Sequence, residues 1–380
     1  MKIFYISTSI IPSRFANSIH VMKMCQAFAK GGHEVVLYAC HSNNLEDEYG
    51  YYGVDRCFDI VKRKWPPVRG IGGFLYAHQV WKDILKKELP DLFYGRDPYS
   101  MSLLASTGCP LIYEAHTPPE NRILEYLMAR IFRYPNFCRL VVISEALKKE
   151  YMRIFHQLSS ARILVAHDGA DIPTDHKTEV FAKDWPGRSD RVQIGYVGHL
   201  YAGKGMEVIA RLAQQMPNCD FHVIGGIEED IERWKESCSE TTNICFHGFV
   251  AHGMLQELYE SFDITLAPYQ RRVVGGGRKV DISRWMSPLK IFEYMAHGKA
   301  IVASDLPVLR EVLIDRENSL LVEPEDIHGW IQAIRSLNDN AQFREMLGTN
   351  ARNSLIKFYS WSVRAEKIIE RTFTEQKSMN

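Results

Sequence analysis

One segment of the sequence, SPLKIFEYMAHG, places a lysine and a glutamate one turn apart at the start of a predicted helix. Ser287 is a favourable N-cap residue, Pro288 suits the first helical position, and Gly298 is a typical helix stop. Lys290 then lies in the first turn, where the helix dipole already creates positive potential. A bound phosphate would resolve this conflict, and Glu293 could accept hydrogen bonds from sugar or ribose hydroxyls. The segment indicates a nucleotide-diphosphate site; an ordinary capped helix with a solvated lysine and glutamate is the alternative.

A glycine-rich turn, GHLYAGKG, occupies residues 198–205 and precedes another predicted helix. Glycines let a polyanion approach the backbone closely, and Lys204 adds a compact positive charge. Taken alone, the pattern also fits an ordinary turn between a strand and a helix. Taken with Lys290, it predicts two lysines that flank one diphosphate at the strand ends of a single sheet.

The elements that would position these groups alternate between β-rich and helical runs, which is typical of parallel α/β sheets. Strand-like runs occupy residues 2–8, 34–40, 91–94, 110–114, 140–143 and 163–166, and then 192–197, 220–224, 243–246, 263–267, 299–303 and 319–322. The sequence therefore predicts two Rossmann-like domains. Because ligands of such sheets bind at the carboxyl ends of the strands, we expect a cleft between the domains.

Turn-forming residues divide the chain between these two series of strands. We expect an N-terminal Rossmann-like domain over residues 1–172, a linker over 173–190 and a second Rossmann-like domain over 191–357. Residues 358–380 are expected to form a C-terminal helix that packs back on the N-terminal domain. The three consecutive glycines 275–277 predict a mobile loop just before the helix that contains Lys290.

Composition excludes several classes of protein. The chain has 380 residues, and its 46 basic and 46 acidic side chains cancel, which argues against a nucleic-acid-binding protein. Eight cysteines without a C-x-x-C pair indicate neither a zinc site nor a disulfide framework. The sequence has no apolar run long enough for a membrane span, and its first apolar run is too short for a signal peptide. We expect a cytoplasmic protein, with contact to the inner face of the membrane as an option.

Further motifs extend over nearly the whole chain. They are ANSIH at 16–20, EAH at 114–116, VISE at 142–145, HDGAD at 167–171, the two lysine-containing segments above, and a strand end at 248–250. Together they resemble the retaining, nucleotide-sugar-dependent glycosyltransferases of the family 4 type, which have the GT-B fold. The motifs are specific for that superfamily and not for one sugar.

The resemblance implies that the domain over 1–172 lies on the acceptor side and that the domain over 191–357 binds the nucleotide-sugar donor. It also implies a role for each matched residue. Lys204 and Lys290 would bind the donor diphosphate and act in catalysis, Glu293 would bind the ribose, and His116 would contact the transferred sugar. A structural histidine is the alternative for His116. The other implied donor contacts are Asn17, Ser18, Gly198, His199, Phe249, Val250, Ser287, Pro288 and Leu289.

Three N-terminal assignments have open alternatives. Arg96 and Glu114 are candidates for acceptor binding, although Arg96 with Asp97 also fits an ordinary surface ion pair. Asn17 and Ser18 would offer backbone N–H groups to a phosphate or sugar, or they would simply cap the first helix.

Two positions depart from the family pattern. The pattern has a glutamate that touches the donor sugar eight places before Glu293, where this chain has Trp285. That role is vacant or has moved, and Asp281 is the candidate. The arginine that commonly follows Gly198 is His199 here. We interpret both departures as a subfamily variant marked by the S-P-x-K pattern.

The predicted function is retaining, metal-independent hexosyl transfer from a nucleotide sugar to a glycan, glycolipid or other hydroxyl acceptor in surface or exopolysaccharide biosynthesis. A UDP-sugar is the first choice of donor and a GDP-sugar the second, with no further cofactor. Basic and aromatic residues interleave over 62–87 and 130–139, which suits an anionic membrane or a lipid-linked acceptor. A catalytically weak nucleotide-sugar-binding partner and a GT-B nucleotide-sugar epimerase are the alternatives.

Overall fold

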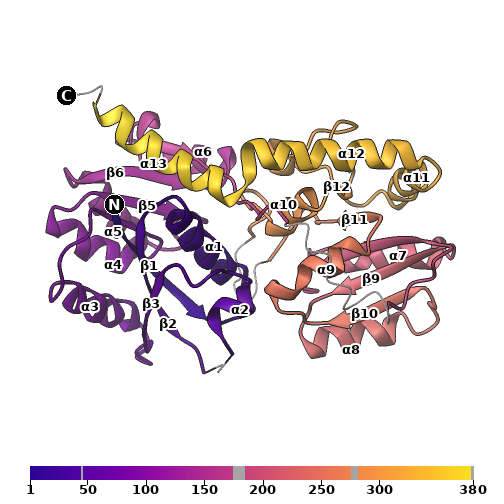
Figure 1. The fold of residues 1–380 in the computed structure, drawn as a ribbon, viewed down its shortest axis with the longest axis horizontal. Coiled ribbons are helices and arrows are strands. Elements are labelled where there is room, and N and C mark those ends of the chain that lie inside the picture. Colours follow the sequence, from indigo (N-terminus) through magenta and orange to yellow (C-terminus); the bar gives the residue numbers. More distant parts are fainter. Residues whose placement is uncertain (44–45, 174–184, 275–280, 378–380) are drawn as a thin grey trace. The chain divides into compact units, whose positions relative to one another are not determined.

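The computed structural model describes residues 1–43, 46–173, 185–274 and 281–377 (Figure 1). They form two compact units, one made of Met1–His167 with Trp361–Asn380 and the other of Asp168–Ser360. The chain therefore passes between the units at 167/168, ahead of the expected linker, and again at 360/361. Most of that linker and the three consecutive glycines lie outside the described residues.

The first unit contains a seven-stranded parallel sheet in the order β3-β2-β1-β4-β5-β6-β7. The strands are β1 (Lys2–Ile11), β2 (Glu34–His41), β3 (Asp59–Arg63), β4 (Leu92–Gly95), β5 (Leu111–Ala115), β6 (Phe137–Val142) and β7 (Ile163–Val165). The sequence did not predict β3, an edge strand of five residues of which Asp59, Lys62 and Arg63 are charged. Helices at both faces bury the central strands, and β1 accordingly begins with the buried apolar run Ile3 to Ile6.

The helices of the first unit connect these strands in order, except for the last helix, which follows the second unit in the sequence. They are α1 (Ala16–Lys30), α2 (Glu48–Tyr52), α3 (Gly72–Ile84), α4 (Pro98–Leu104), α5 (Arg122–Arg133), α6 (Glu145–Ile154) and α13 (Trp361–Lys377). Helix α13, yellow in Figure 1, packs against α1 and β6 although it is the last helix of the chain.

The second unit has a six-stranded parallel sheet in the order β10-β9-β8-β11-β12-β13. The strands are β8 (Val192–Val197), β9 (Cys219–Ile224), β10 (Ile244–Gly248), β11 (Ile264–Ala267), β12 (Ala300–Ser304) and β13 (Leu320–Val322). The helices are α7 (Met206–Gln215), α8 (Glu228–Ser237), α9 (Leu255–Glu260), α10 (Leu289–Ala296), α11 (Ile327–Asn338) and α12 (Ala341–Ser354). Both units confirm the predicted Rossmann-like α/β architecture.

Two apolar clusters cover opposite faces of the second sheet, because alternate residues of a strand point to opposite sides. One contains Ile194 and Tyr196 of β8 with residues of α7 and α11. The other contains Val197 of β8 with Ile291 and Phe292 of α10. Helix α10 is thus fixed by its apolar face, which determines where its first turn lies.

No described helix combines the length and the apolarity that a membrane span requires.

Candidate functional site

The start of helix α10 differs from the predicted cap. Pro288 occupies the N-cap position with extended backbone, and the Ser287 hydroxyl accepts a hydrogen bond from the Asp168 backbone N–H at 2.9 Å. Ser287 as the N-cap is therefore wrong; its side chain joins the helix start to another segment of the same unit. Gly298, at φ +60°, follows the helix end as predicted.

Lys290 lies in the first turn of α10 and is buried, with 8% of its surface exposed. Its Nζ lies 3.6 Å from the centre of the Tyr196 ring and has no hydrogen-bond partner among the described residues. Burial and the nearby Lys204 hold the pKa of Lys290 well below its usual value, although Glu293 opposes this. A buried, unpaired ammonium group costs free energy, so this position is prepared for an anion.

The turn after β8 holds Lys204 between two glycines with left-handed backbone, Gly203 at φ +88° and Gly205 at φ +92°. A Cβ on Gly205 would lie 2.0 Å from the Pro268 carbonyl oxygen, so a larger residue would displace the turn. Burial lowers the pKa of Lys204 to about 8.

The two predicted lysines share one aromatic neighbour. Nζ of Lys204 lies 5.0 Å, and Nζ of Lys290 5.3 Å, from the centre of the Tyr269 ring. Gly198 lies beside them, since a Cβ added there would be 2.8 Å from the Lys290 Nζ. The structure thus brings together both lysines and Gly198, as the sequence predicted.

Glu293, one turn further along α10, is held by two side chains that sequence reasoning missed. His252 Nε2 lies 2.6 Å from its Oε1, and the Tyr259 hydroxyl donates to Oε2 at 2.5 Å. Burial raises the pKa of Glu293, but His252 and Tyr259 outweigh it and keep the net pKa below its usual value. His252 comes shortly after the half-buried Phe249 and Val250, so it continues a segment already assigned to the base.

Two further residues near these lysines have local structural roles. The His199 ring stacks on Tyr201 with a centroid distance of 5.4 Å, and its carbonyl accepts from the Tyr196 hydroxyl at 2.6 Å. Asp281 Oδ1 accepts from the backbone N–H groups of Val273 and Ser283, each at 3.0 Å. Asp281 therefore stabilises its own loop.

In the first unit, Glu114 at the end of β5 is completely buried. Its carboxylate accepts hydrogen bonds from the Tyr94 hydroxyl at 2.7 Å and the Tyr5 hydroxyl at 3.2 Å. It also contacts His20 and His116 and receives a hydrogen bond from Arg364. Burial raises the pKa of Glu114, but Arg364 and His20 outweigh it and hold the pKa well below the usual value.

His116 lies two residues further on, with its Nε2 3.1 Å from the Glu114 Oε1. Burial, Arg96 and His20 lower the pKa of His116 to about 4, although Glu114 opposes them. The His20 ring packs edge-on against His116 at 4.6 Å and against Trp361 at 5.2 Å. A fully buried Glu114 cannot itself touch an acceptor here, so we assign it to positioning His116.

Sequence reasoning missed two members of this group. His20 belongs to the ANSIH motif, but it was assigned no role from the sequence. Its proximity to Glu114 could have been predicted, because α1 begins, and β5 ends, at the carboxyl edge of the same parallel sheet. Arg364 lies in α13, and nothing in the local sequence indicates that it reaches Glu114.

Two N-terminal alternatives are wrong. The predicted surface pair of Arg96 with Asp97 is not what the structure shows: Asp97 is 3% exposed and caps α4 by accepting from the N–H groups of Tyr99 and Ser100. Phe15, not Asn17 or Ser18, occupies the N-cap of α1. The Ser18 hydroxyl is buried and donates to the Phe15 carbonyl oxygen at 2.7 Å.

Asn17 and Arg96 lie close to each other at the same end of the first sheet. The Asn17 side-chain amide donates to the Ser9 hydroxyl at 3.2 Å, and the Asn17 backbone carbonyl oxygen accepts from the Arg96 Nη1 at 3.5 Å. Arg96 stays a candidate for contact with an acceptor, and Asn17 for contact with a distal phosphate or sugar of the donor.

Two side-chain groups among the described residues have metal-ligand spacing. One is His20, Glu114 and His116, whose carboxylate already pairs with the Arg364 guanidinium, a cation that would repel a metal ion. The other is His222, Cys245 and His247 in the second unit.

Comparisons with known proteins agree with this two-unit organisation. Residues 18–173 match the family model described as Glycosyltransferase Family 4, and residues 191–340 match the model described as Glycosyl transferases group 1. A phosphatidyl-myo-inositol mannosyltransferase of Mycolicibacterium smegmatis is 29% identical over 92% of this chain and 88% of its own length. An uncharacterized glycosyltransferase of Methanocaldococcus jannaschii is 28% identical over 61% of this chain. This chain spans only 58% of that relative and 59% of a second one from the same organism.

Solved structures share the whole fold at low sequence identity. A glycosyltransferase from Rickettsia africae superposes with a TM-score of 0.77 at 14% identity, over 99% of both chains. Sucrose-phosphate synthase from Thermosynechococcus elongatus superposes with a TM-score of 0.75 at 16% identity, over 100% of both chains. Anabaena HepE in complex with UDP gives 0.73 at 14% identity, also over 100% of both. The fold is therefore GT-B.

Proposed function

We propose, from the premise that this chain joins a Glycosyltransferase Family 4 domain to a Glycosyl transferases group 1 domain, that it is a retaining, metal-independent glycosyltransferase. It moves a hexosyl group from a nucleotide-diphosphate sugar to a hydroxyl of a glycan, a glycolipid or a similar acceptor. The observation that carries this proposal is the buried Lys290 ammonium without a hydrogen-bond partner among the described residues, close to Lys204.

The leaving diphosphate gains negative charge as the bond from the anomeric carbon to oxygen breaks. Lys204 and Lys290, with the first turn of α10, would meet that charge in a site of low dielectric. Preorganised donors of this kind contribute about 3–4 kcal/mol each to transition-state stabilisation. The two lysines supply the positive charge in this proposal, so it requires no metal ion.

Glu293 would bind the ribose. Each carboxylate oxygen can accept more than one hydrogen bond, so the contacts with His252 and Tyr259 leave capacity for ribose hydroxyls. His252 and Tyr259 act as positioning residues, because they fix the carboxylate. Gly198 and His199 would lie beside the diphosphate, and Phe249 with Val250 beside the base.

In the first unit, His116 would contact the transferred sugar as a neutral imidazole. Glu114 orients its ring, since Nε2 of His116 lies 3.1 Å from the Glu114 Oε1. Arg96 would contact the acceptor, and Asn17 would contact the distal phosphate or the sugar of the donor. No carboxylate nucleophile is needed if the acceptor attacks from the face that the diphosphate leaves.

A UDP-sugar is the first candidate donor and a GDP-sugar the second. Structures of Anabaena HepE, which has the same fold, contain UDP and UDP-glucose. The mycobacterial relative is a phosphatidyl-myo-inositol mannosyltransferase, which supports a lipid-linked or saccharide acceptor here.

Peripheral contact with an anionic membrane on the cytoplasmic side is part of the proposal. Near the start of α3, Trp65, Ile71 and Phe74 are exposed large apolar residues. On α5, Ile123 and Tyr126 are also exposed, and the same helix contains Arg130 and Arg133. Exposed apolar side chains beside basic ones are typical of interfacial helices.

The test is a thermal-shift screen of the purified protein with UDP-, GDP-, ADP- and dTDP-sugars, followed by chromatography of the donors that bind. Slow release of the nucleoside diphosphate, with the anomeric configuration of the product assigned by NMR, would support a retaining transferase. Binding without turnover towards any acceptor class would favour the catalytically weak partner. Conversion to an isomeric nucleotide sugar without release would favour the epimerase.

A further inference from the structure

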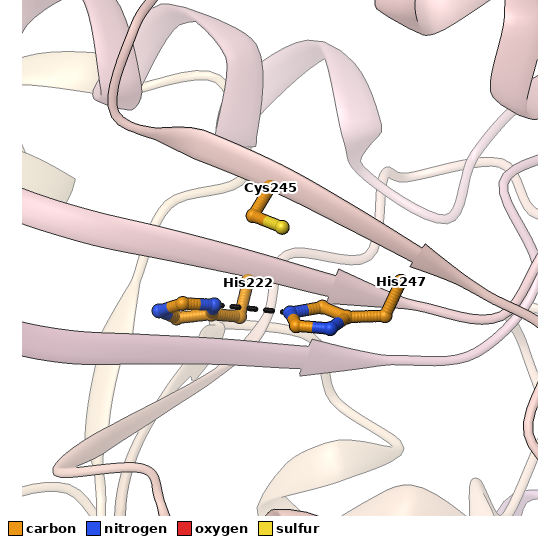
Figure 2. A group of neighbouring side chains, drawn as sticks. All are labelled: His222, Cys245 and His247. Atoms are coloured by element: carbon orange, nitrogen blue, oxygen red, sulfur yellow. Dashed lines mark hydrogen bonds between the residues drawn. The ribbon is translucent and has the colours of Figure 1, made fainter. Parts of the chain in front are cut away.

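Two histidines and a cysteine of the second unit lie side by side on one face of the sheet. His222 comes from β9, while Cys245 and His247 lie two positions apart on β10. Cys245 is the register partner of His222, so these two side chains leave the sheet on the same side. The register shifts between Phe246 and Gly248, and His247, which lies between them, contacts His222 through its Nε2. Their ligand atoms all lie within 4.8 Å of one another, and Figure 2 shows the two imidazoles joined by a hydrogen bond with the cysteine beside them.

The tautomer of His222 is determined by its surroundings. Gln193 donates through Nε2 to the carbonyl oxygens of Arg188 and Arg191, both at 2.9 Å, which fixes the orientation of its amide. Its Oε1 therefore accepts, at 2.7 Å, from His222 Nε2. Nδ1 of His222 then carries a lone pair directed at the His247 Nε2, 3.0 Å away.

An oriented imidazole of this kind is what a metal site requires. Metal-binding histidines usually donate their second N–H to a fixed oxygen, and Gln193 provides that oxygen. Trp185 reinforces the arrangement: its ring stacks on His247 with a centroid distance of 5.1 Å, and its Nε1 donates to the same Gln193 oxygen at 3.1 Å.

We propose that His222, Cys245 and His247 bind one Zn²⁺ ion through Nδ1, Sγ and Nε2, with a water molecule as the fourth ligand. Two nitrogens and a thiolate suit this borderline-soft ion. In tetrahedral zinc sites neighbouring ligand nitrogens lie about 3.3 Å apart, close to the 3.0 Å between the two imidazoles here. Strand β10 is at the edge of the sheet, and Cys245 and His247 are only half-buried, so the ion can enter from that edge.

Zinc binding releases one proton to the solvent. The thiol of Cys245 releases its proton to solvent, and the Nε2 proton of His247 moves to Nδ1 by exchange with water, so one proton leaves per ion. The site would join the edge strand β10 to β9. It is independent of Lys204 and Lys290, because none of its ligands is among the proposed donor-binding residues.

The sequence could not indicate this site, because its ligands come from two strands and share no C-x-x-C spacing. A C-x-x-C motif places its ligands within one turn of the chain, whereas here strand pairing places His222 opposite Cys245.

The test uses the full chain, stripped with a chelator and titrated with Co²⁺ as a spectroscopic substitute for Zn²⁺. We expect one equivalent of Co²⁺ to give tetrahedral d–d bands and a thiolate-to-cobalt charge-transfer band, both displaced by Zn²⁺. The charge-transfer band should be lost in Cys245→Ser and retained in Cys238→Ser, a buried cysteine of the same unit. Zn²⁺ should raise the melting temperature of the wild type by an amount that grows with the logarithm of free Zn²⁺.

His247→Gln provides a second variant in case Cys245→Ser does not fold. It should lose both the d–d bands and the zinc-dependent melting shift, while His328→Gln, an exposed histidine on α11, should keep them. A charge-transfer band that survives in Cys245→Ser, or a wild-type protein that binds no stoichiometric Co²⁺ or Zn²⁺, would overturn the proposal.

Discussion

Arg364 and Glu114 are 250 positions apart in the sequence and form a buried ion pair inside the first unit. The guanidinium also donates through Nε to the His167 carbonyl oxygen at 2.9 Å. The last helix thus completes the surroundings of a carboxylate that orients His116. Glu114 therefore contacts both Arg364 of the C-terminal helix and His116, the proposed sugar contact.

Replacing Arg364 by Met should destabilise the first unit by about 3–5 kcal/mol, because it leaves the Glu114 charge buried without its strongest partner. Urea unfolding measures the loss, and hydrogen exchange assigns it to the first unit. Arg153→Met is the matched control, since that guanidinium pairs with Glu150 at the surface and is 70% exposed. The double variant with Glu114→Gln should recover part of the loss; equal stability of wild type and Arg364→Met would contradict the pairing.

Lys290→Met should stabilise the free protein and remove donor binding together. It eliminates a buried ammonium that has no hydrogen-bond partner among the described residues, and it keeps the side-chain volume. A gain of about 1 kcal/mol would raise the melting temperature by about 2–4 °C in a unit of this size. Thermal scans with and without UDP measure both effects, and Lys235→Met, an exposed lysine of α8, should change neither. A variant that still responds to UDP like the wild type would refute the role of Lys290.

Affinity for UDP should fall as the pH rises above about 8. Burial lowers the pKa of Lys204 to about 8, so the free protein loses this proton just above that pH. A diphosphate favours the protonated lysine, and binding at pH 9 must therefore take up a proton. Calorimetry in two buffers of different ionisation enthalpy measures that uptake. It should decrease in Lys204→Arg, whose side chain stays charged, and its absence in the wild type would exclude Lys204 from the anion site.

His116 should make the first unit less stable in weak acid. With a pKa of about 4 in the folded state, it stays neutral while the unfolded chain binds a proton at its ordinary value near 6.5. Stability should therefore fall as the pH decreases from about 6.5 to about 4. His116→Gln should reduce this dependence in unfolding experiments at pH 7.5 and pH 5, and it should also lose turnover. An unchanged slope would show that His116 is protonated in the folded state.

Glu293 should determine the preference for a ribose. The wild type is expected to bind UDP at least about tenfold more tightly than 2′-deoxy-UDP, since a hydrogen bond to a charged group contributes about 1.5–3 kcal/mol. Glu293→Gln should remove most of that ratio, and His252→Ala should reduce it by releasing the carboxylate. Full discrimination in Glu293→Gln would assign the ribose to another residue.

The sequence predicted the fold well because its strong signals are local. Apolar strand runs such as β1 and the glycine that ends α10 depend on neighbouring residues alone. Strand β3 was missed because an edge strand is covered on fewer sides and its sequence, DIVKR, carries charges. Ser287 was misassigned because its hydroxyl can accept from a backbone N–H of its own helix or from one of a distant segment. Only the tertiary structure decides between these two donors, and it selects Asp168.

Lys204, Lys290 and Gly198 could be placed together from sequence because each follows or begins an element at the same edge of one sheet. His252, Tyr259, His20 and Arg364 could not, since each reaches its carboxylate through packing. The same holds for His222 and Cys245, which strand register alone places opposite each other.

The chain passes from the first unit to the second and back again, and this order has a consequence for biosynthesis. A ribosome completes the second unit before it has made Arg364. Until then Glu114 lies in a nascent sheet that still lacks its strongest cationic partner. The first unit can therefore complete its folding only after helix α13 has emerged from the ribosome. The fold thus delays assembly of the His116 environment until helix α13 has been synthesised.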